Sequence, residues 1–173
     1  MKIDLSKFTI KKCSLTHLDD ILLIQSKAFE DLPSANLLRK NTDQTLAECL
    51  SSPHVTMGAW YNDRMAAFSI LYYPYTDKEN LSLSLEGIDV VGVKSANNKL
   101  CIVSREFRGN SLQYELGRRL EAFAVASGTK LMCATVSPDN IYSYRNIIRL
   151  GFIYNKTLIK YEEYVRDLFY KFI

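Results

Sequence analysis

Histidine is scarce in this sequence, and its cysteines follow no metal-binding pattern. The chain contains two histidines. Its four cysteines are far apart and include no CxxC pair: Cys13, Cys49, Cys101 and Cys133. Zinc sites need closely spaced Cys and His ligands, and disulfide frameworks belong to small secreted domains. We therefore expect free, mostly buried thiols and no metal ion.

Long apolar runs are also missing. No segment approaches the ~20 apolar residues of a membrane-spanning helix, and charged residues interrupt residues 1–12, where a secretory signal would be apolar. We expect a cytoplasmic protein with no membrane partner. With 173 residues, 47% hydrophobic and 24% charged, the composition is typical of one globular domain, which we expect to span residues 1–173.

The net charge is small but uneven. It is +3 in total, because residues 1–100 hold eleven Lys/Arg against twelve Asp/Glu, whereas residues 101–173 hold eleven against seven. The surplus in the second half is either solubilising surface or a sign of an anionic partner bound there. It falls short of a nucleic-acid footprint and no RNA or DNA motif is present, so we expect no nucleic-acid partner.

Hydrophobic periodicity predicts alternating strands and helices. Predicted strands cover residues 8–12, 54–61, 65–73, 100–107, 130–136, 152–161 and 164–172. Predicted helices begin near residues 16, 43, 112 and 138. Thr16 and Asp19 resemble a capping box for the first helix, and Asn62-Asp63 is typical of a hairpin turn. Residues 74–98 show no clean period and predict a long excursion.

This order of elements predicts a mixed α/β fold. The β-α-β unit over residues 100–136 implies a parallel strand pair with a right-handed crossover, and the hairpins at both ends imply antiparallel edges. We expect a central mixed sheet of about seven strands flanked by helices.

The stretch SREFRGNSLQ, residues 104–113, connects an apolar strand to a helix. A helix N-terminus presents about four N–H groups without helical partners, together with partial positive charge, and so attracts anions such as phosphate. Arg108 adds a cation, Gly109 allows close backbone approach, and Asn110 or Ser111 can cap the helix. A well-capped helix start alone also explains the stretch.

A second stretch, NIYSYRNIIRLGF from Asn140 to Phe152, lies one β-α unit downstream. Together the two stretches resemble the GNAT superfamily of acetyl-CoA-dependent N-acetyltransferases, whose turn follows (Q/R)-x-x-G-x-(G/A) and whose later helix carries N-x-x-A-x-x-x-Y-x-x-x-G-F. The resemblance covers nearly the whole chain. It implies a three-layer GNAT-like fold, acetyl-CoA or coenzyme A as cofactor, and transfer of the acetyl group to a primary amine of a small molecule or peptide, by direct attack of that amine.

The resemblance also implies a set of cofactor-binding residues. The strand backbone would pair with the pantetheine arm, the turn would hold the pyrophosphate, and the Asn140 amide would bond the arm. The set is Ile102, Val103, Ser104, Arg108, Gly109, Asn110, Ser111, Leu112, Gln113, Asn140 and Ser143. The chain departs from the motif at Ser111 and Gln113, and we expect Ser111 to be right-handed helical within the first turn. Asn140 could equally be a helix cap.

Isoleucine stands where the family often has the tyrosine that protonates the coenzyme A thiolate. Tyr144 lies three residues before Ile147, on nearly the same helix face, and is our candidate catalytic acid, with core packing as the alternative. Glu86 and Glu106 could relay the amine proton or simply be solvated. Cys101 lacks a paired histidine, as does Cys133, and both are expected in the core.

The motifs do not identify the acceptor amine. Tyr72, Tyr73 and Tyr75 lead into residues 74–98, which would cover the acceptor side and suggest a partly aromatic pocket. The departures from the motif also fit a catalytically weak acyl-CoA sensor or partner domain. A homodimer is left open.

Overall fold

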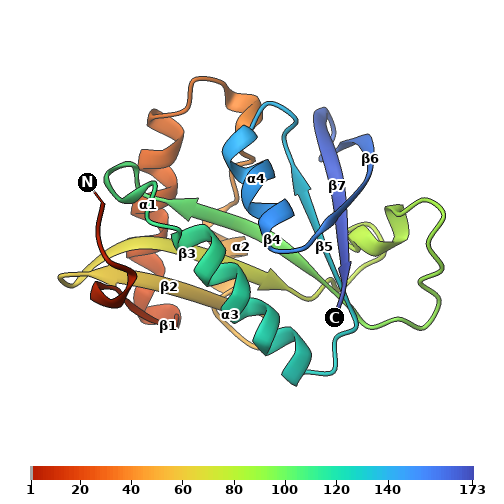
Figure 1. Ribbon diagram of the computed structural model, residues 1–173, viewed down its shortest axis with the longest axis horizontal. Helices are drawn as coiled ribbons and strands as arrows, with labels where there is room; N and C mark the ends of the chain where they lie inside the picture. Colours follow the sequence, from red (N-terminus) through yellow and green to blue (C-terminus); the bar gives the residue numbers. More distant parts are fainter. Residues whose placement is uncertain (1) are drawn as a thin grey trace.

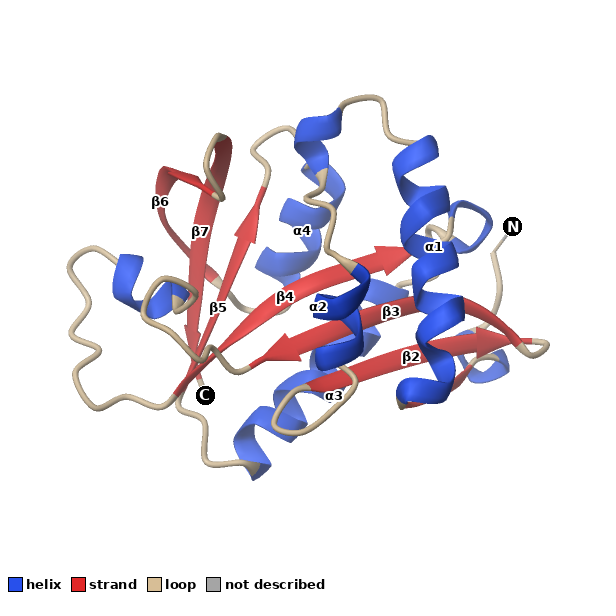
Figure 2. Cartoon of the chain, turned by 180° about the vertical axis from the view of Figure 1, so that it is seen from behind, coloured by secondary structure: helices blue, strands red, loops and turns tan. Residues whose placement is uncertain are grey.

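The computed structural model describes residues 2–173, which form one seven-stranded mixed sheet with helices on both faces (Figures 1 and 2). The strands are β1 (Thr9–Lys12), β2 (Val55–Tyr61), β3 (Arg64–Tyr72), β4 (Ser95–Val103), β5 (Leu131–Val136), β6 (Ile153–Lys160) and β7 (Tyr164–Phe172). The helices are α1 (Leu18–Glu30), α2 (Asp43–Glu48), α3 (Leu112–Ala126) and α4 (Ile141–Arg149). The predicted mixed α/β fold and its element order are confirmed.

The sheet has the order β1-β2-β3-β4-β5-β7-β6. β4 and β5 are parallel, and the neighbouring pairs on either side of them are antiparallel. The β2–β3 hairpin turns through Asn62 and Asp63, whose φ angles of 48° and 61° suit the right-handed twist of the strands. No helix in residues 2–173 is long and apolar enough to cross a membrane.

Two apolar cores lie on opposite faces of the sheet. α1 and α2 cover one face, and α3 and α4 cover the other (Figure 2). α3 buries Leu112, Leu116 and Leu120 at helical spacing. Gly117 belongs to this packing, because a Cβ there would lie 2.6 Å from Leu150 Cδ1, at the end of α4. The glycine lets α3 pack closely against this end of α4.

Two predicted boundaries were wrong. β4 begins at Ser95 rather than residue 100 and ends at Val103, because Ser95 to Asn98 pair with β5 despite the low strand propensity of serine and asparagine. At the start of α1, the predicted capping box of Thr16 and Asp19 does not form: Ser14 is the N-cap of a 3-10 turn, Leu15–His17, and its N–H donates to His17 Nδ1 at 3.0 Å. A short 3-10 turn therefore precedes the helix.

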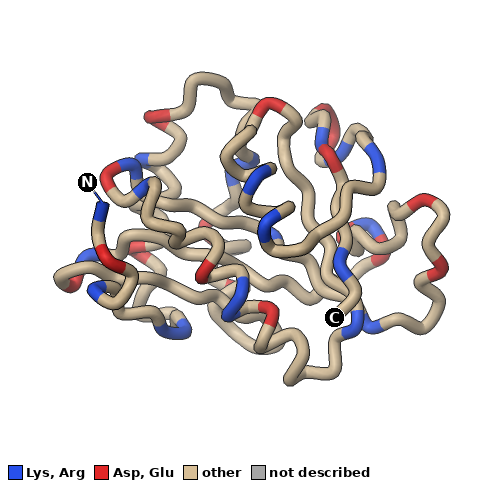
Figure 3. Tube along the Cα trace, viewed as in Figure 1, with Lys and Arg blue, Asp and Glu red and all other residues tan. Residues whose placement is uncertain are grey.

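The surplus positive charge of the second half is distributed rather than concentrated. Figure 3 shows Lys and Arg interspersed with Asp and Glu along most of the trace. Several form exposed ion pairs, as Arg64 Nη2 does with Glu106 Oε1 at 2.5 Å. Exposed pairs of this kind contribute about 0–1 kcal/mol each, so they are mainly solubilising.

β4 and β5 separate halfway along their length. Their pairing runs from Ser95↔Leu131 to Asn98↔Ala134 and stops there, although β4 continues to Val103. On its other edge β4 stays paired with β3, with one irregularity: Ile70 faces Leu100 and Leu71 faces Asn98, so Lys99 is an extra residue. Such a bulge bends a strand. The bend coincides with the point where β4 leaves β5.

Candidate functional site

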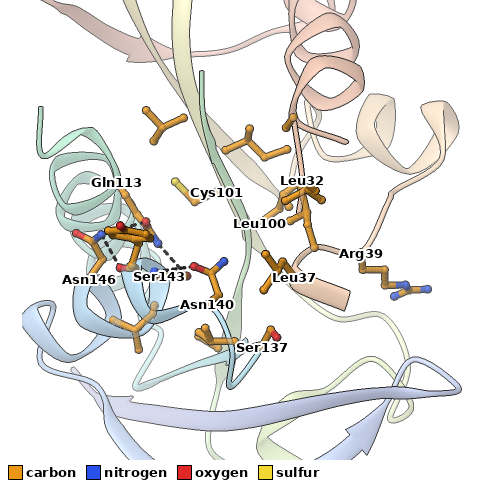
Figure 4. A pocket seen from close by; sticks show the side chains of 18 of the residues that line it. Leu32, Leu37, Arg39, Leu100, Cys101, Gln113, Ser137, Asn140, Ser143 and Asn146 are labelled. Carbon is orange, nitrogen blue, oxygen red and sulfur yellow. Dashed lines mark hydrogen bonds between the residues drawn. The ribbon is translucent and has the colours of Figure 1, made fainter. Parts of the chain in front are cut away.

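A cavity of about 920 Å³ occupies the gap between the separated strands. Four segments contribute most of its wall: the α1–α2 loop, the second half of β4, the turn before α3, and the stretch from the end of β5 into α4. Figure 4 shows Gln113 and Asn146 on one side of β4 and Arg39 and Leu37 on the other. The cavity thus reaches both faces of the sheet at the place where pairing is interrupted.

The exposed edge of β4 can accept an extended ligand. From Lys99 to Val103 the edge that faces β5 has no strand partner, so backbone N–H and C=O groups are open to pairing with a ligand arm. Ile102 and Val103 line the cavity as predicted. Ser104 does not line it, because its N–H donates to Ala66 O at 2.9 Å and completes the β3 ladder.

The turn before α3 presents its backbone N–H groups. Among the described residues, those of Gly109, Ser111, Leu112 and Gln113 donate to no carbonyl. Gly109 has φ 84°, and α3 continues normally because Glu115 N–H donates to Ser111 O at 3.0 Å. Open amides at a helix N-terminus form an anion site.

The prediction that Ser111 is right-handed was wrong. Its φ of 59° and ψ of 17° are left-handed, an arrangement that costs a non-glycine residue about 1–2 kcal/mol. The left-handed residue reverses the chain between the turn and α3, a local geometry that apolar spacing does not report. Neither predicted cap forms in the expected way: Ser111 makes no side-chain cap bond, and Asn110 instead accepts from Ile3 N at 2.7 Å and donates to Phe107 O at 3.0 Å. Asn110 does not line the cavity.

A polar network connects the starts of α3 and α4. Gln113 Nε2 donates to Ser143 Oγ at 3.2 Å, and Asn146 Nδ2 donates to Gln113 Oε1 at 3.2 Å (Figure 4). The long Gln113 side chain, at a position where the motif has a small residue, therefore spans the gap between the two helices. Arg108 lies beside it on the cavity wall, with Nε 3.4 Å from Val103 O.

Asn140 satisfies two roles with different atoms. Its Oδ1 accepts from Ser143 N at 3.1 Å and caps α4. Its Nδ2 donates to no described residue, and the side chain lines the cavity (Figure 4). The amide is therefore open to a ligand while the cap is kept.

The structure does not bring Tyr144 to the cavity. Its ring packs edge-on against Phe169, with centroids 5.2 Å apart, and it is absent from the cavity wall. Ile147, 3% exposed, does line the wall. Tyr142, two residues before Tyr144, also lines it and is 76% exposed. The geometry favours core packing for Tyr144 over a role as acid.

The other chemical candidates are also placed. Burial raises the pKa of the Cys101 thiol and that of the Cys133 thiol to about 12, so neither is a thiolate at neutral pH. Glu106 Oε1 forms an ion pair with Arg64 Nη2 at 2.5 Å, and Glu86 Oε2 lies 3.7 Å from Lys156 Nζ. Neither glutamate lines the cavity.

Residues 74–98, which the sequence analysis expected to cover an acceptor, contribute little to the cavity. Of residues 74–98 only Asn98, which belongs to β4, lines the cavity, and the Tyr72 hydroxyl donates to Glu79 Oε1 at 2.6 Å. The wall is completed by three cationic and two hydroxyl-bearing side chains that the sequence analysis missed: Arg39, Lys99, Arg166, Thr135 and Tyr161. A usable signal was present, since Arg166 and Asp167 place two adjacent charges in the middle of a predicted strand.

Known structures share this fold over almost the whole chain. A scan of protein-family models and a search of curated proteins both gave no match. Solved structures do match. The GNAT-family acetyltransferase of Streptococcus pneumoniae has a TM-score of 0.73 at 14% identity, covering 96% of this chain and 99% of its own. The structure of yncA from Salmonella typhimurium, solved with its cofactor acetyl-CoA, has a TM-score of 0.71 at 16% identity and covers 96% of this chain and 94% of its own.

A third match is the ribosomal-protein-S18-alanine N-acetyltransferase of Escherichia coli, with a TM-score of 0.70 at 16% identity over 96% of this chain and 94% of its own. A mixed sheet that separates between two parallel strands, with a helix N-terminus beside the gap, defines a class of α/β proteins. The chain has the fold of that class, which is the fold of the GNAT acetyltransferases.

Proposed function

We propose that this protein transfers an acetyl group from acetyl-CoA to a primary amine of a small molecule or peptide. The observation that carries the proposal is one continuous cavity that joins the unpaired β4 edge, the open amides before α3 and a separate polar end across the sheet. Two substrates can therefore approach from opposite faces and meet where β4 and β5 part. The acetyl-CoA bound to yncA supports the same cofactor for this chain.

The residues present fit coenzyme A. The N–H groups of Gly109, Ser111 and Gln113, with the Arg108 cation, suit the pyrophosphate. The β4 edge at Ile102 and Val103 suits the pantetheine amides. When bound, the cofactor supplies an activated thioester, so positioning of the amine provides much of the rate.

Proton handling needs no side chain at position 147. As the amine nitrogen bonds to the acetyl carbon and the C–S bond breaks, the amine releases a proton to solvent and the thiolate takes one up. Water suffices for both transfers at an exposed cavity mouth. Because Tyr144 packs against Phe169, we expect Tyr144→Phe to keep the parental turnover, measured as thiol release at saturating amine. A fall of about 10²-fold or more would assign general-acid catalysis to its hydroxyl.

The test of the proposal has two readouts. Calorimetry measures acetyl-CoA binding, and thiol release measures turnover with a panel of primary amines. Binding with turnover supports the enzyme. Tight binding without turnover on any amine would favour the alternative, an acyl-CoA sensor or partner domain, for which isoleucine at position 147 is the supporting observation. Absence of binding would refute both.

A further inference from the structure

Three cationic side chains meet at the end of the cavity opposite the α3 turn. Arg39 comes from the α1–α2 loop, Lys99 from the bulge of β4, and Arg166 from β7. None of them forms an ion pair with any residue in the range 2–173. Three unpaired cations on one wall create a positive potential that a bound anion would relieve.

Arg166 is the strongest of these observations. It is 4% exposed, and its one hydrogen bond within the described chain runs from Nη1 to Val165 O at 2.8 Å. Its neighbour Asp167 does not neutralise it, because that carboxylate accepts from Thr157 Oγ1 at 2.6 Å and successive strand residues face opposite sides of the sheet. A guanidinium has five N–H donors, and a buried one without a carboxylate is costly. Donors that face the cavity are suited to a ligand oxyanion.

Lys99 is placed by the bulge. As the extra residue of β4 it breaks the alternation of the strand, and its Nζ lies 4.4 Å from the centroid of the Tyr72 ring. Burial, and then the nearby charge of Arg39, lower the pKa of Lys99, although the Cys49 thiol and Glu79 act in the opposite direction. The cation is thus held in a partly desolvated place next to a second cation.

Tyr161 holds Arg39 at the same end. The guanidinium lies 4.4 Å from the centroid of the Tyr161 ring, and the Tyr161 hydroxyl is 3.2 Å from Thr135 Oγ1. Tyr161 and Glu162 form the β6–β7 turn with φ angles of 55° and 76°, a conformation that bulky residues rarely adopt. This turn brings the Tyr161 ring to the cavity wall, between Arg39 of the α1–α2 loop and Thr135 of β5.

From this arrangement we propose that the acceptor amine carries an oxyanion, a carboxylate or a phosphate, and that Arg39, Lys99 and Arg166 bind it. This inference rests on the proposed function, because only an acetyltransferase would use the bound molecule as an acetyl acceptor. Arg166 supplies the buried, pre-oriented donors, and Arg39 closes over the anion from the loop side. The amine end of such a molecule then points toward β4, where the acetyl group would lie.

Matched amines test the specificity. O-phosphoethanolamine is compared with ethanolamine, and β-alanine with β-alaninamide, so that each pair shares a primary amine and differs in the anion. We expect kcat/KM to favour at least one charged member about tenfold or more, since a charge-assisted contact is typically worth that factor. Arg166→Met should remove this preference. Arg39→Gln, an exposed position that does not threaten folding, should reduce it, and Lys40→Gln, an exposed neighbour outside the cavity wall, should not.

A second measurement does not depend on turnover. Inorganic phosphate is titrated by calorimetry into the wild-type protein, Arg39→Gln and Arg108→Gln, without coenzyme A. We expect binding to weaken about tenfold in Arg39→Gln and to persist in Arg108→Gln. Loss in Arg108→Gln alone would assign phosphate to the α3 turn and overturn the inference, as would equal kcat/KM within both amine pairs. Failure of acetyl-CoA to bind would refute the proposed function, while the phosphate titration would still decide the anion site.

Discussion

At the scale of single residues, this site uses side chains whose structural and ligand-facing atoms differ. Asn140 caps α4 through Oδ1 and leaves Nδ2 at the cavity wall. Gln113 uses both ends of its amide to connect α3 with α4. A structural hydrogen bond made by one atom of such a side chain therefore does not argue against ligand binding by another atom. A substitution that removes one of the two atoms and keeps the other distinguishes the structural role from the binding role.

Asn140→Asp separates the two roles. The carboxylate still accepts from Ser143 N–H and suits a helix N-terminus, so thermal stability should be kept. The donor is lost, and one hydrogen bond is worth about 1 kcal/mol, so the Kd for acetyl-CoA should rise about fivefold or more. Calorimetry measures the Kd. If the variant bound acetyl-CoA as tightly as the parent, Asn140 would be a cap only.

Lys99→Met tests how much the buried positive charge of Lys99 destabilises the folded protein. Because burial lowers the pKa of Lys99 below its unfolded value of about 10.5, the unfolded chain binds more protons in the window between the two values. The destabilisation is therefore fully present below the folded pKa and disappears as the pH rises toward 10.5. We expect Lys99→Met to raise the thermal midpoint at pH 7 by about 2–4 °C, and less at pH 10. Lys78→Met, at an exposed position, is the control. A lower midpoint than the parent at pH 7 would contradict the assigned cost.

At the scale of elements, the turn before α3 is a built structure and not a flexible linker. Positive φ angles at Gly109 and Ser111 turn the chain so that several N–H groups face one region. Between them, Asn110 anchors the turn by accepting from the N–H of Ile3. The proposed anion site is therefore pre-organised, which lowers the entropic cost of binding.

Gly109→Leu should weaken coenzyme A binding through this turn. The φ of 84° is unfavourable for leucine by about 1–2 kcal/mol, and the side chain would crowd the approach to the open amides. Gly128→Leu is a matched control, since Gly128 has φ 76°, equal space for a Cβ, and lies beyond the other end of α3. Both variants should lose similar stability in denaturant, and only Gly109→Leu should lose affinity by calorimetry. Equal affinity in the two variants would remove the turn from the site.

At the scale of the whole molecule, the sheet consists of two parts joined by a short parallel segment. β1 to β4 form one part and β5 to β7 the other, and between them the ladder has four residue pairs, from Ser95 to Asn98 of β4. The rest of the β4 edge is left for a ligand. A bound arm at this edge would add backbone hydrogen bonds across the gap and stabilise the folded state by mass action.

Hydrogen exchange can test this division of β4. Amides on the β5 side of residues 99–103 should exchange quickly in the free protein and be protected about tenfold or more with saturating acetyl-CoA. Amides of residues 95–98 should be protected in both states, because β5 already pairs with them. Protection that rises equally along all of β4 would indicate general stabilisation and not strand addition.

Local pattern in the sequence was enough for the element order, the mixed sheet and most of the predicted residues that line the cavity near the α3 turn. Strand and helix periods, the Gly109 turn and the Asn140 motif all act within one β-α unit, so neighbouring residues carry the information. The polar start of β4 and the packing of Tyr144 depended on partners far along the chain. The left-handed Ser111 is a local turn geometry that apolar spacing does not report. The cationic end of the cavity was decided by tertiary structure alone. Arg39, Lys99 and Arg166 are distant in sequence, and only the bulge of β4, the α1–α2 loop and the β7 register bring their charges to one wall of one cavity.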